Sequence, residues 1–321
     1  MFAPNLHLAV IEITSNCNLS CKHCYGFYNK NLFINLDDFK DICFQLKDLG
    51  VSIITLSGGE PLMVGNLLAD YLEESKKLFQ VVQLTTNGTL INKSNIYLLK
   101  NVDLVQVSLD GPQEIHDYIR GKGNFVKTLT ALKLLKKHNI KCSIMMTVNP
   151  YNLSYLNQMV KIAKILKVPI GFERITNVGR GKNFCQLSKK ESKKLINVSI
   201  KLKIKSSDPL FLMSNKSYKN YLLNNHILGG CMAGNMAICI DTFLNVLPCA
   251  RLRVILGNLK QYTLTEILKR SEIVQNLSNR MLLKGKCGSC KYKFVCGGCR
   301  AMAYAKNKDY LDEDPGCFYN C

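Results

Sequence analysis

Six apolar strand-like runs alternate with segments of helical period between residue 6 and about residue 175. The predicted strands cover residues 8–13, 52–56, 81–85, 104–108, 141–148 and 169–174, and the predicted helices cover residues 36–49, 67–78, 95–100, 126–138 and 153–166. Strands and helices that alternate in this way form a parallel sheet with right-handed crossovers. Six units are too few for the closed eight-stranded barrel, so the sequence predicts an α/β fold with a partial (β/α)6 TIM-like barrel.

The cysteines are unevenly distributed along the chain. Nine of the fifteen lie in residues 229–321, a region poor in long periodic helices. We therefore expect a barrel core over residues 1–185, a basic helical bridge over residues 186–228 and a cysteine-rich domain over residues 229–321. A disulfide framework is typical of secreted chains, and this sequence has no export signal. Reduced thiolates that bind metal in the cytoplasm are the better interpretation.

Polar motifs follow the first four predicted strands. They are Cys17–Cys24, Ser57–Glu60, Thr86–Gly88 and Ser108–Gly111. Open parallel sheets bind their ligands at the carboxyl ends of the strands. The sequence therefore predicts that these four motifs meet at one site.

The first motif has metal-ligand spacing. Cys17, Cys21 and Cys24 lie on one loop and can hold three irons of a [4Fe-4S] cube, which leaves the fourth iron without a protein ligand. A cluster that only transfers electrons normally has four protein ligands. An open metal position instead indicates a site for a reactant.

The distal cysteines also have metal-ligand spacing. They are Cys231 and Cys249, then two C-x2-C pairs formed by Cys287, Cys290, Cys296 and Cys299, and finally Cys317. A zinc ribbon is the main competing interpretation of paired C-x2-C turns. Seven ligands suit two cubes, or one cube and a smaller cluster, better than one zinc ion. Cys239 is a further candidate ligand.

The formal net charge of +20 bears on the partners. Solvated lysine-rich helix faces are one explanation. The other is attraction of an acidic partner, such as a peptide precursor, a carboxylated small molecule or an acidic electron-donor protein. A nucleic-acid partner is less favoured, because the sequence has no basic stripe interleaved with aromatic residues. No segment approaches the roughly 18 consecutive apolar residues of a membrane span.

Taken in this order, the residues resemble the radical S-adenosylmethionine superfamily, and specifically its SPASM-domain branch, over nearly the whole chain. The resemblance implies a catalytic [4Fe-4S] cluster on Cys17, Cys21 and Cys24 whose open iron binds S-adenosylmethionine. One electron, delivered by a flavodoxin- or ferredoxin-type reductant, then cleaves the sulfonium, and a 5′-deoxyadenosyl radical removes a substrate hydrogen.

The same resemblance assigns further residues. Gly58, Gly59 and Glu60 are expected to bind the methionine amine of the cofactor. The other expected cofactor-binding residues are Asn87, Ser108, Asp110 and Arg120. Glu173 and Arg174, at the end of the sixth strand, are candidate acid–base residues.

The resemblance also implies one or two auxiliary iron–sulfur clusters. Cys231, Cys249 and Cys299 would serve the first, and Cys287, Cys290, Cys296 and Cys317 would serve the second. The first set lacks an evident fourth ligand. Leu244 stands where a glycine is usual, so we expect an altered hairpin turn. Ala250 follows Cys249 where sulfatase-maturing members carry an aspartate, which argues against formylglycine formation.

The leading functional hypothesis is a radical enzyme that forms a thioether or carbon–carbon crosslink in a ribosomally made peptide. Only sixteen residues precede Cys17, so leader recognition would need another surface or a separate protein. Processing of a tetrapyrrole side chain, in haem or modified haem formation, is the alternative within the family. A non-catalytic iron–sulfur or zinc scaffold is the alternative of another class.

Overall fold

The computed structural model describes residues 5–26, 31–225 and 229–319. Its strands are β1 (Leu8–Thr14), β2 (Ile53–Gly58), β3 (Val81–Thr86), β4 (Leu104–Ser108), β5 (Cys142–Val148), β6 (Ile170–Arg174), β7 (Ala237–Ile240), β8 (Asn245–Leu247) and β9 (Gly257–Asn258). Within the described residues they form one sheet in the order β6-β5-β4-β3-β2-β1-β7-β8-β9. Neighbouring strands from β6 to β1 pair in parallel, which confirms the predicted partial barrel.

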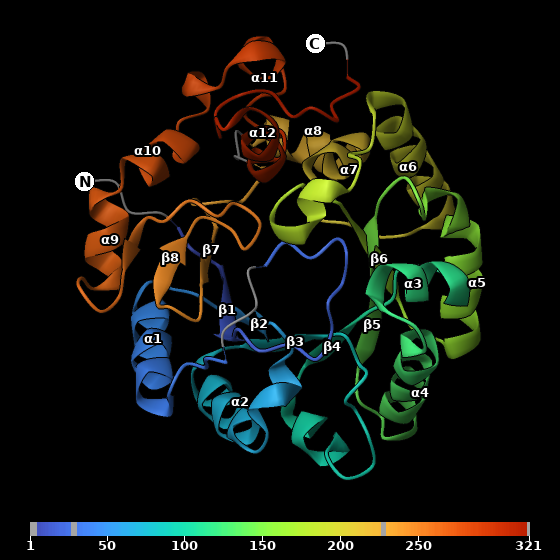
Figure 1. Cartoon of the computed structure of the whole chain (residues 1–321). Coiled ribbons are helices and arrows are strands. Elements are labelled where there is room, and N and C mark those ends of the chain that lie inside the picture. Colours follow the sequence, from blue (N-terminus) through green and yellow to red (C-terminus); the bar gives the residue numbers. More distant parts are fainter. Residues whose placement is uncertain (1–4, 27–30, 226–228, 320–321) are drawn as a thin grey trace.

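Helices cover the outer side of this curved sheet (Figure 1). Those of the barrel are α1 (Leu36–Asp48), α2 (Leu67–Leu78), α3 (Gln113–Arg120), α4 (Asn124–Lys137) and α5 (Leu156–Leu166). The later helices are α6 (Lys189–Leu202), α7 (Pro209–Ser214), α8 (Lys216–Asn224), α9 (Leu264–Arg270), α10 (Glu272–Ser278), α11 (Gly285–Ser289) and α12 (Arg300–Asn307). The helix predicted near residues 95–100 is the 3-10 helix η2 (Ile96–Asn101). No described helix is long and apolar enough to cross a membrane.

One buried apolar cluster joins the strands to the helices that cover them. Ile11 on β1, Ile54 on β2 and Val105 on β4 are fully buried and share this cluster with Phe39 of α1 and Leu132 of α4. Burial of apolar side chains is the main favourable contribution to such packing. The cluster fixes the sheet, and with it the positions of the strand ends.

The cysteine-rich segment continues the same sheet. β7 pairs in parallel with β1, and β7, β8 and β9 then pair antiparallel. The sheet therefore runs from the barrel into residues 229–319. We retain the division into 1–185, 186–228 and 229–321 as a proposal, and its boundary at residue 228 lies outside the described residues.

The turn between β7 and β8 contains a leucine with an unusual backbone. Leu244 has a φ of 64°, in the left-handed region that favours glycine. Its backbone N–H donates to the carbonyl oxygen of Asp241 at 2.9 Å, and its side chain is buried. The turn thus keeps a glycine-like backbone although leucine occupies the position.

Candidate active site

The three cysteines of the first motif lie on the loop that follows β1, which is the blue loop inside the ring of strands in Figure 1. Cys21 is buried, and Cys17 and Cys24 are half-buried. Burial raises the pKa of the Cys17 thiol to about 11 and also raises the pKa of Cys21. Thiols are soft ligands that suit iron–sulfur clusters, so this donor set fits the implied cube. Binding of the cluster would release the thiol protons.

The segment Gly179-Arg180-Gly181, which follows β6, packs against the loop that carries the three cysteines. A Cβ atom on Gly179 would lie 2.7 Å from the carbonyl oxygen of Cys24, so a side chain does not fit there. The backbone N–H of Gly181 donates to the same oxygen at 3.1 Å, and Arg180 Nε donates to the carbonyl oxygen of Cys21 at 3.0 Å. These residues were not predicted from the sequence, although two glycines around an arginine after a strand are a usable signal.

Gly58 and Gly59 let the end of β2 approach the cluster loop closely. A Cβ on Gly58 would lie 2.3 Å from the carbonyl oxygen of Thr14, and one on Gly59 would lie 2.1 Å from that of Asn16. The N–H groups of Gly59 and Glu60 donate to these two oxygens at 2.7 and 2.8 Å. In this structure the glycines therefore serve close contact between two loops, in addition to any role toward a ligand.

The Glu60 carboxylate joins the ends of β2 and β3. It is fully buried and accepts hydrogen bonds from Thr86 Oγ1 at 2.7 Å, from the Asn87 N–H at 2.8 Å and from the Leu62 N–H at 3.2 Å. Burial raises the pKa of Glu60, and these three donors oppose that rise because they favour the ionised form. Glu60 thus positions the two strand ends around the cluster loop.

Replacing Glu60 with alanine is expected to raise the Kd for S-adenosylmethionine by at least about tenfold, because loss of the carboxylate leaves three donors unpaired at the site. Calorimetric titration of the cluster-loaded protein measures this. Glu73→Ala removes an exposed carboxylate on α2 and is the matched control. An unchanged Kd in Glu60→Ala would remove Glu60 from the site.

Asp110 lies at the centre of a buried charged network. Its carboxylate contacts His23 Nε2 at 2.7 Å, pairs with Arg120 Nε and accepts the Thr147 N–H at 2.8 Å. Burial disfavours the charged carboxylate, but Arg120 and His23 outweigh it and hold the pKa of Asp110 well below its usual range. Arg120 Nη1 in turn lies 3.9 Å from Cys21 Sγ. Asp110 therefore positions the guanidinium of Arg120 beside the cluster loop.

Asn87 and Ser108 also lie at strand ends. The Asn87 amide donates to Asn18 Oδ1 at 2.9 Å and accepts from the Thr89 N–H at 2.8 Å. Ser108 is half-buried at the end of β4, in register with Met145 of β5. Asn87 thus contacts the cluster loop directly, and Ser108 lies on the strand that precedes Asp110.

Glu173 and Arg174 lie at the end of β6, in different surroundings. Arg174 is buried, and its guanidinium pairs with Asp208 at 2.6 Å and with Asp314 at 2.7 Å. Glu173 is half-buried and pairs with Arg251 at 3.3 Å. These contacts favour a structural role for Arg174, because its charge is fully used in joining β6 to two distant segments.

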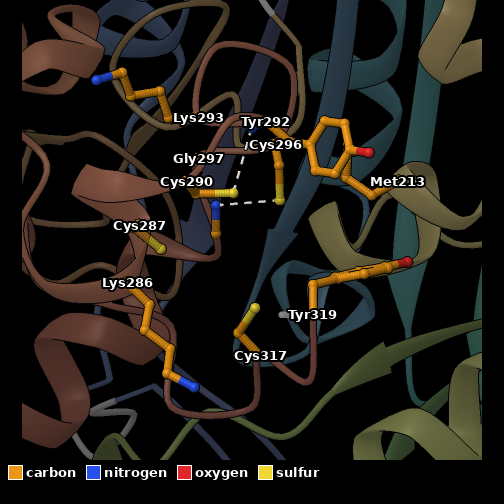
Figure 2. A pocket seen from close by; sticks show the side chains of 11 residues that line it. Met213, Lys286, Cys287, Cys290, Tyr292, Lys293, Cys296, Gly297, Cys317 and Tyr319 are labelled. Atoms are coloured by element: carbon orange, nitrogen blue, oxygen red, sulfur yellow. Dashed lines mark hydrogen bonds between the residues drawn. The ribbon is translucent and has the colours of Figure 1, made fainter. Parts of the chain in front are cut away.

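Four distal cysteines line one cavity, and Figure 2 shows their sulfur atoms directed toward it. They are Cys287, Cys290, Cys296 and Cys317. N–H groups donate to two of these sulfurs, from Tyr292 to Cys290 at 3.3 Å and from Gly298 to Cys296 at 3.4 Å. Buried Arg300 Nη2 lies 3.5 Å from Cys287 Sγ. Donors and positive charge around the thiols fit a cluster, because they stabilise its anionic form.

The other implied cluster set lies in a separate buried group. Cys299 belongs to a small apolar cluster against which Cys231 and Cys249 pack. Cys239 is fully buried on β7 and is not among the residues of that cluster. Across the described ranges, no group of three or more His, Cys, Asp or Glu side chains is arranged to hold a single metal ion.

The chain is similar to several known proteins. Residues 11–163 match the family described as the Radical SAM superfamily. The AdoMet-dependent heme synthase of Methanosarcina barkeri is 31% identical, over 96% of this chain and 95% of that protein. The subtilosin biosynthesis protein AlbA of Bacillus subtilis is 29% identical, over 96% of this chain and 70% of that protein. The structure of anSMEcpe with bound AdoMet and the Cp18Cys peptide has a TM-score of 0.74 at 24% identity, and covers 98% of this chain and 94% of its own.

Proposed function

The chain belongs to the radical S-adenosylmethionine superfamily and to its SPASM branch, and from that premise we propose that it removes a hydrogen atom from a tetrapyrrole side chain. Members of this family are enzymes that use a [4Fe-4S] cluster and S-adenosylmethionine, so this chain is an enzyme with both cofactors. The similarity to the M. barkeri heme synthase over nearly the full length of both chains supports the choice of substrate.

The strand ends supply the residues for the two cofactors. When bound, the cluster and S-adenosylmethionine supply a hydrogen-abstracting radical. We propose that Cys17, Cys21 and Cys24 hold the cluster and that the loop of Glu60 binds the methionine end of the cofactor. His23 Nδ1 is buried and has no hydrogen-bond partner among the described residues, so it is available to hydrogen-bond with S-adenosylmethionine.

Of the two arginines that follow Cys249, Arg251 is the better suited to a carboxylated substrate. Arg253 is tightly held, because both of its terminal nitrogens contact the Glu12 carboxylate, at 2.6 and 2.9 Å. Arg251 makes a longer contact of 3.3 Å with Glu173, whose side chain is 38% exposed. Arg251 can therefore exchange Glu173 for a substrate carboxylate more readily than Arg253 can exchange Glu12. Tetrapyrrole propionates provide such carboxylates.

A peptide substrate is the second candidate. The similarity to AlbA, which is named for the biosynthesis of the bacteriocin subtilosin, supports it. The +20 formal charge would attract an acidic precursor. A precursor-like small gene beside this one would favour the peptide, whereas neighbouring tetrapyrrole-pathway genes would favour the tetrapyrrole.

The test is a substrate titration under anoxic conditions. An iron tetrapyrrole with propionate side chains is expected to stimulate 5′-deoxyadenosine formation. Arg251→Gln is expected to raise the half-saturating concentration by about tenfold, through loss of a charged contact. Arg270→Gln, on the exposed face of α9, is the matched control. Stimulation by a neighbouring-gene peptide and none by the tetrapyrrole would overturn the proposal.

A further inference from the structure

A surface hollow beside the second set of distal cysteines is lined mainly by lysines. Its lining residues are Lys189, Lys190, Lys193, Lys286, Cys317 and Phe318. The first three lie on α6 and Lys286 lies on α11, so segments far apart in the sequence form it. We propose that this hollow docks an acidic electron-donor protein that carries a flavin or an iron–sulfur cluster. The proposal rests on the proposed function and on the auxiliary cluster implied for Cys287, Cys290, Cys296 and Cys317.

The hollow adjoins the thiol-lined cavity of Figure 2. Lys286 and Cys317 line both, so the surface hollow and the cavity share two residues. Cys317 is half-buried, as is Cys290 of the same set. A protein seated on the lysines would therefore bring its own redox group close to the cluster. One electron then passes from the reduced donor to the oxidised cluster, and no bond is made or broken.

Four of the six residues that line this hollow are lysines, and none of the six is acidic. Across the parts of the chain that the structure describes, none of the four lysines forms an ion pair. The carboxylate of Glu191, in the first turn of α6, is used by Ser188 in the cap of that helix, at 2.7 and 2.9 Å. Glu313 accepts the backbone N–H of Lys286. Exposed charges of one sign in a concave surface attract partners of the opposite sign and accelerate their association.

The position of the lysines favours an electron donor over an acidic leader peptide. An acidic leader peptide would need basic residues but no nearby redox centre. An electron donor must also approach a redox centre. The hollow combines the unpaired lysines with a thiol of the second set, and Lys293 lines the adjoining cavity. Both requirements of a donor are thus met at one place.

The test compares two charge-reversal variants of the anoxically purified, cluster-loaded protein. The triple variant Lys189→Glu, Lys190→Glu and Lys193→Glu changes the hollow. The control is Lys133→Glu, Lys136→Glu and Lys137→Glu, three exposed lysines on α4 with the same total charge change. A bacterial flavodoxin is the probe, oxidised for calorimetric binding and fully reduced for stopped-flow reduction of the clusters.

The hollow variant is expected to raise the Kd for flavodoxin, and to slow cluster reduction by it, at least about tenfold at low salt. The control variant should change both far less. Reduction by the small cation methyl viologen should not be slowed in either variant, because added negative charge attracts a cation, and an undiminished rate shows that the clusters are intact. Equal effects of the two variants would overturn the proposal. So would loss of binding to a precursor peptide with unchanged binding to flavodoxin. Iron content and 5′-deoxyadenosine formation report separately on the proposed function.

Discussion

Replacement of Cys21 with alanine is expected to abolish 5′-deoxyadenosine formation. Cys21 is the most buried thiol of its loop. Arg120 contacts its sulfur, and Arg180 donates to its backbone carbonyl oxygen. With only Cys17 and Cys24 left, two protein ligands cannot hold the cube at this position. The iron content should fall by about four per chain, while the distal clusters remain.

The measurement is anoxic product analysis together with iron determination. Cys43→Ala is the matched control, because Cys43 is a fully buried thiol in the apolar face of α1, away from the strand ends. That variant should retain both its iron and its activity. Persistent cleavage of S-adenosylmethionine in Cys21→Ala would refute the assignment of this loop.

Replacement of Asp314 with alanine is expected to lower the free energy of unfolding by about 3–5 kcal/mol, because it leaves the buried Arg174 charge with one partner fewer. Asp314 is itself buried and also accepts the N–H groups of Cys299 and Gly316, both at 2.9 Å. Its loss therefore loosens the junction between β6 and the cysteine-rich segment. Urea unfolding of the cluster-loaded protein, followed by circular dichroism, measures the effect.

Two further variants separate the buried charge from the lost contacts. The double variant Arg174→Met with Asp314→Ala should lose less stability than Asp314→Ala alone, because it removes the guanidinium that Asp314→Ala leaves with one partner fewer. Asp208, the other partner of Arg174, keeps the N–H of Leu210 as a donor at 2.9 Å. Asp309→Ala removes an exposed pair with Lys284 and should have a much smaller effect. Equal losses in Asp314→Ala and the double variant would contradict the ion-pair account.

The stability that Asp314 contributes depends on pH in a definite direction. Burial opposes its ionisation, but Arg174 and two backbone N–H groups outweigh burial and lower the pKa of Asp314. A lowered folded-state pKa stabilises the fold fully above the unfolded value of about 3.9, and the contribution is lost as pH falls toward the folded value. The difference between wild type and Asp314→Ala should therefore be complete at neutral pH and shrink in acid.

Periodicity predicted the barrel strands because each is a buried run between helices of clear period. It missed α3, the helix that carries His116 and Arg120, because its sequence Gln113–Arg120 is short and mostly polar. The short helices of the cysteine-rich segment were missed for the same reason. Local sequence cannot show which of them are stabilised by packing against the rest of the fold.

Spacing predicted the sets of thiol ligands but not the contacts that position them. The partners of Asp110 come from the cluster loop, from α3 and from β5, and His23 lies 87 residues away along the chain. The donors to Glu60 lie up to 27 residues away. Glu173 and Arg174 are adjacent in sequence, yet one is half-buried beside Arg251 and the other is buried in ion pairs. Only the folded sheet brings these side chains together.

The most direct measurement is electron–nuclear double resonance on the reduced, anoxically purified protein with S-adenosylmethionine labelled with ¹⁵N at its amino group. If Cys17, Cys21 and Cys24 leave one iron open to this ligand, the spectrum should show ¹⁵N coupling to a cluster, and Cys21→Ala should lose it. A spectrum that shows no nitrogen coupling and does not change when S-adenosylmethionine is added would contradict the account.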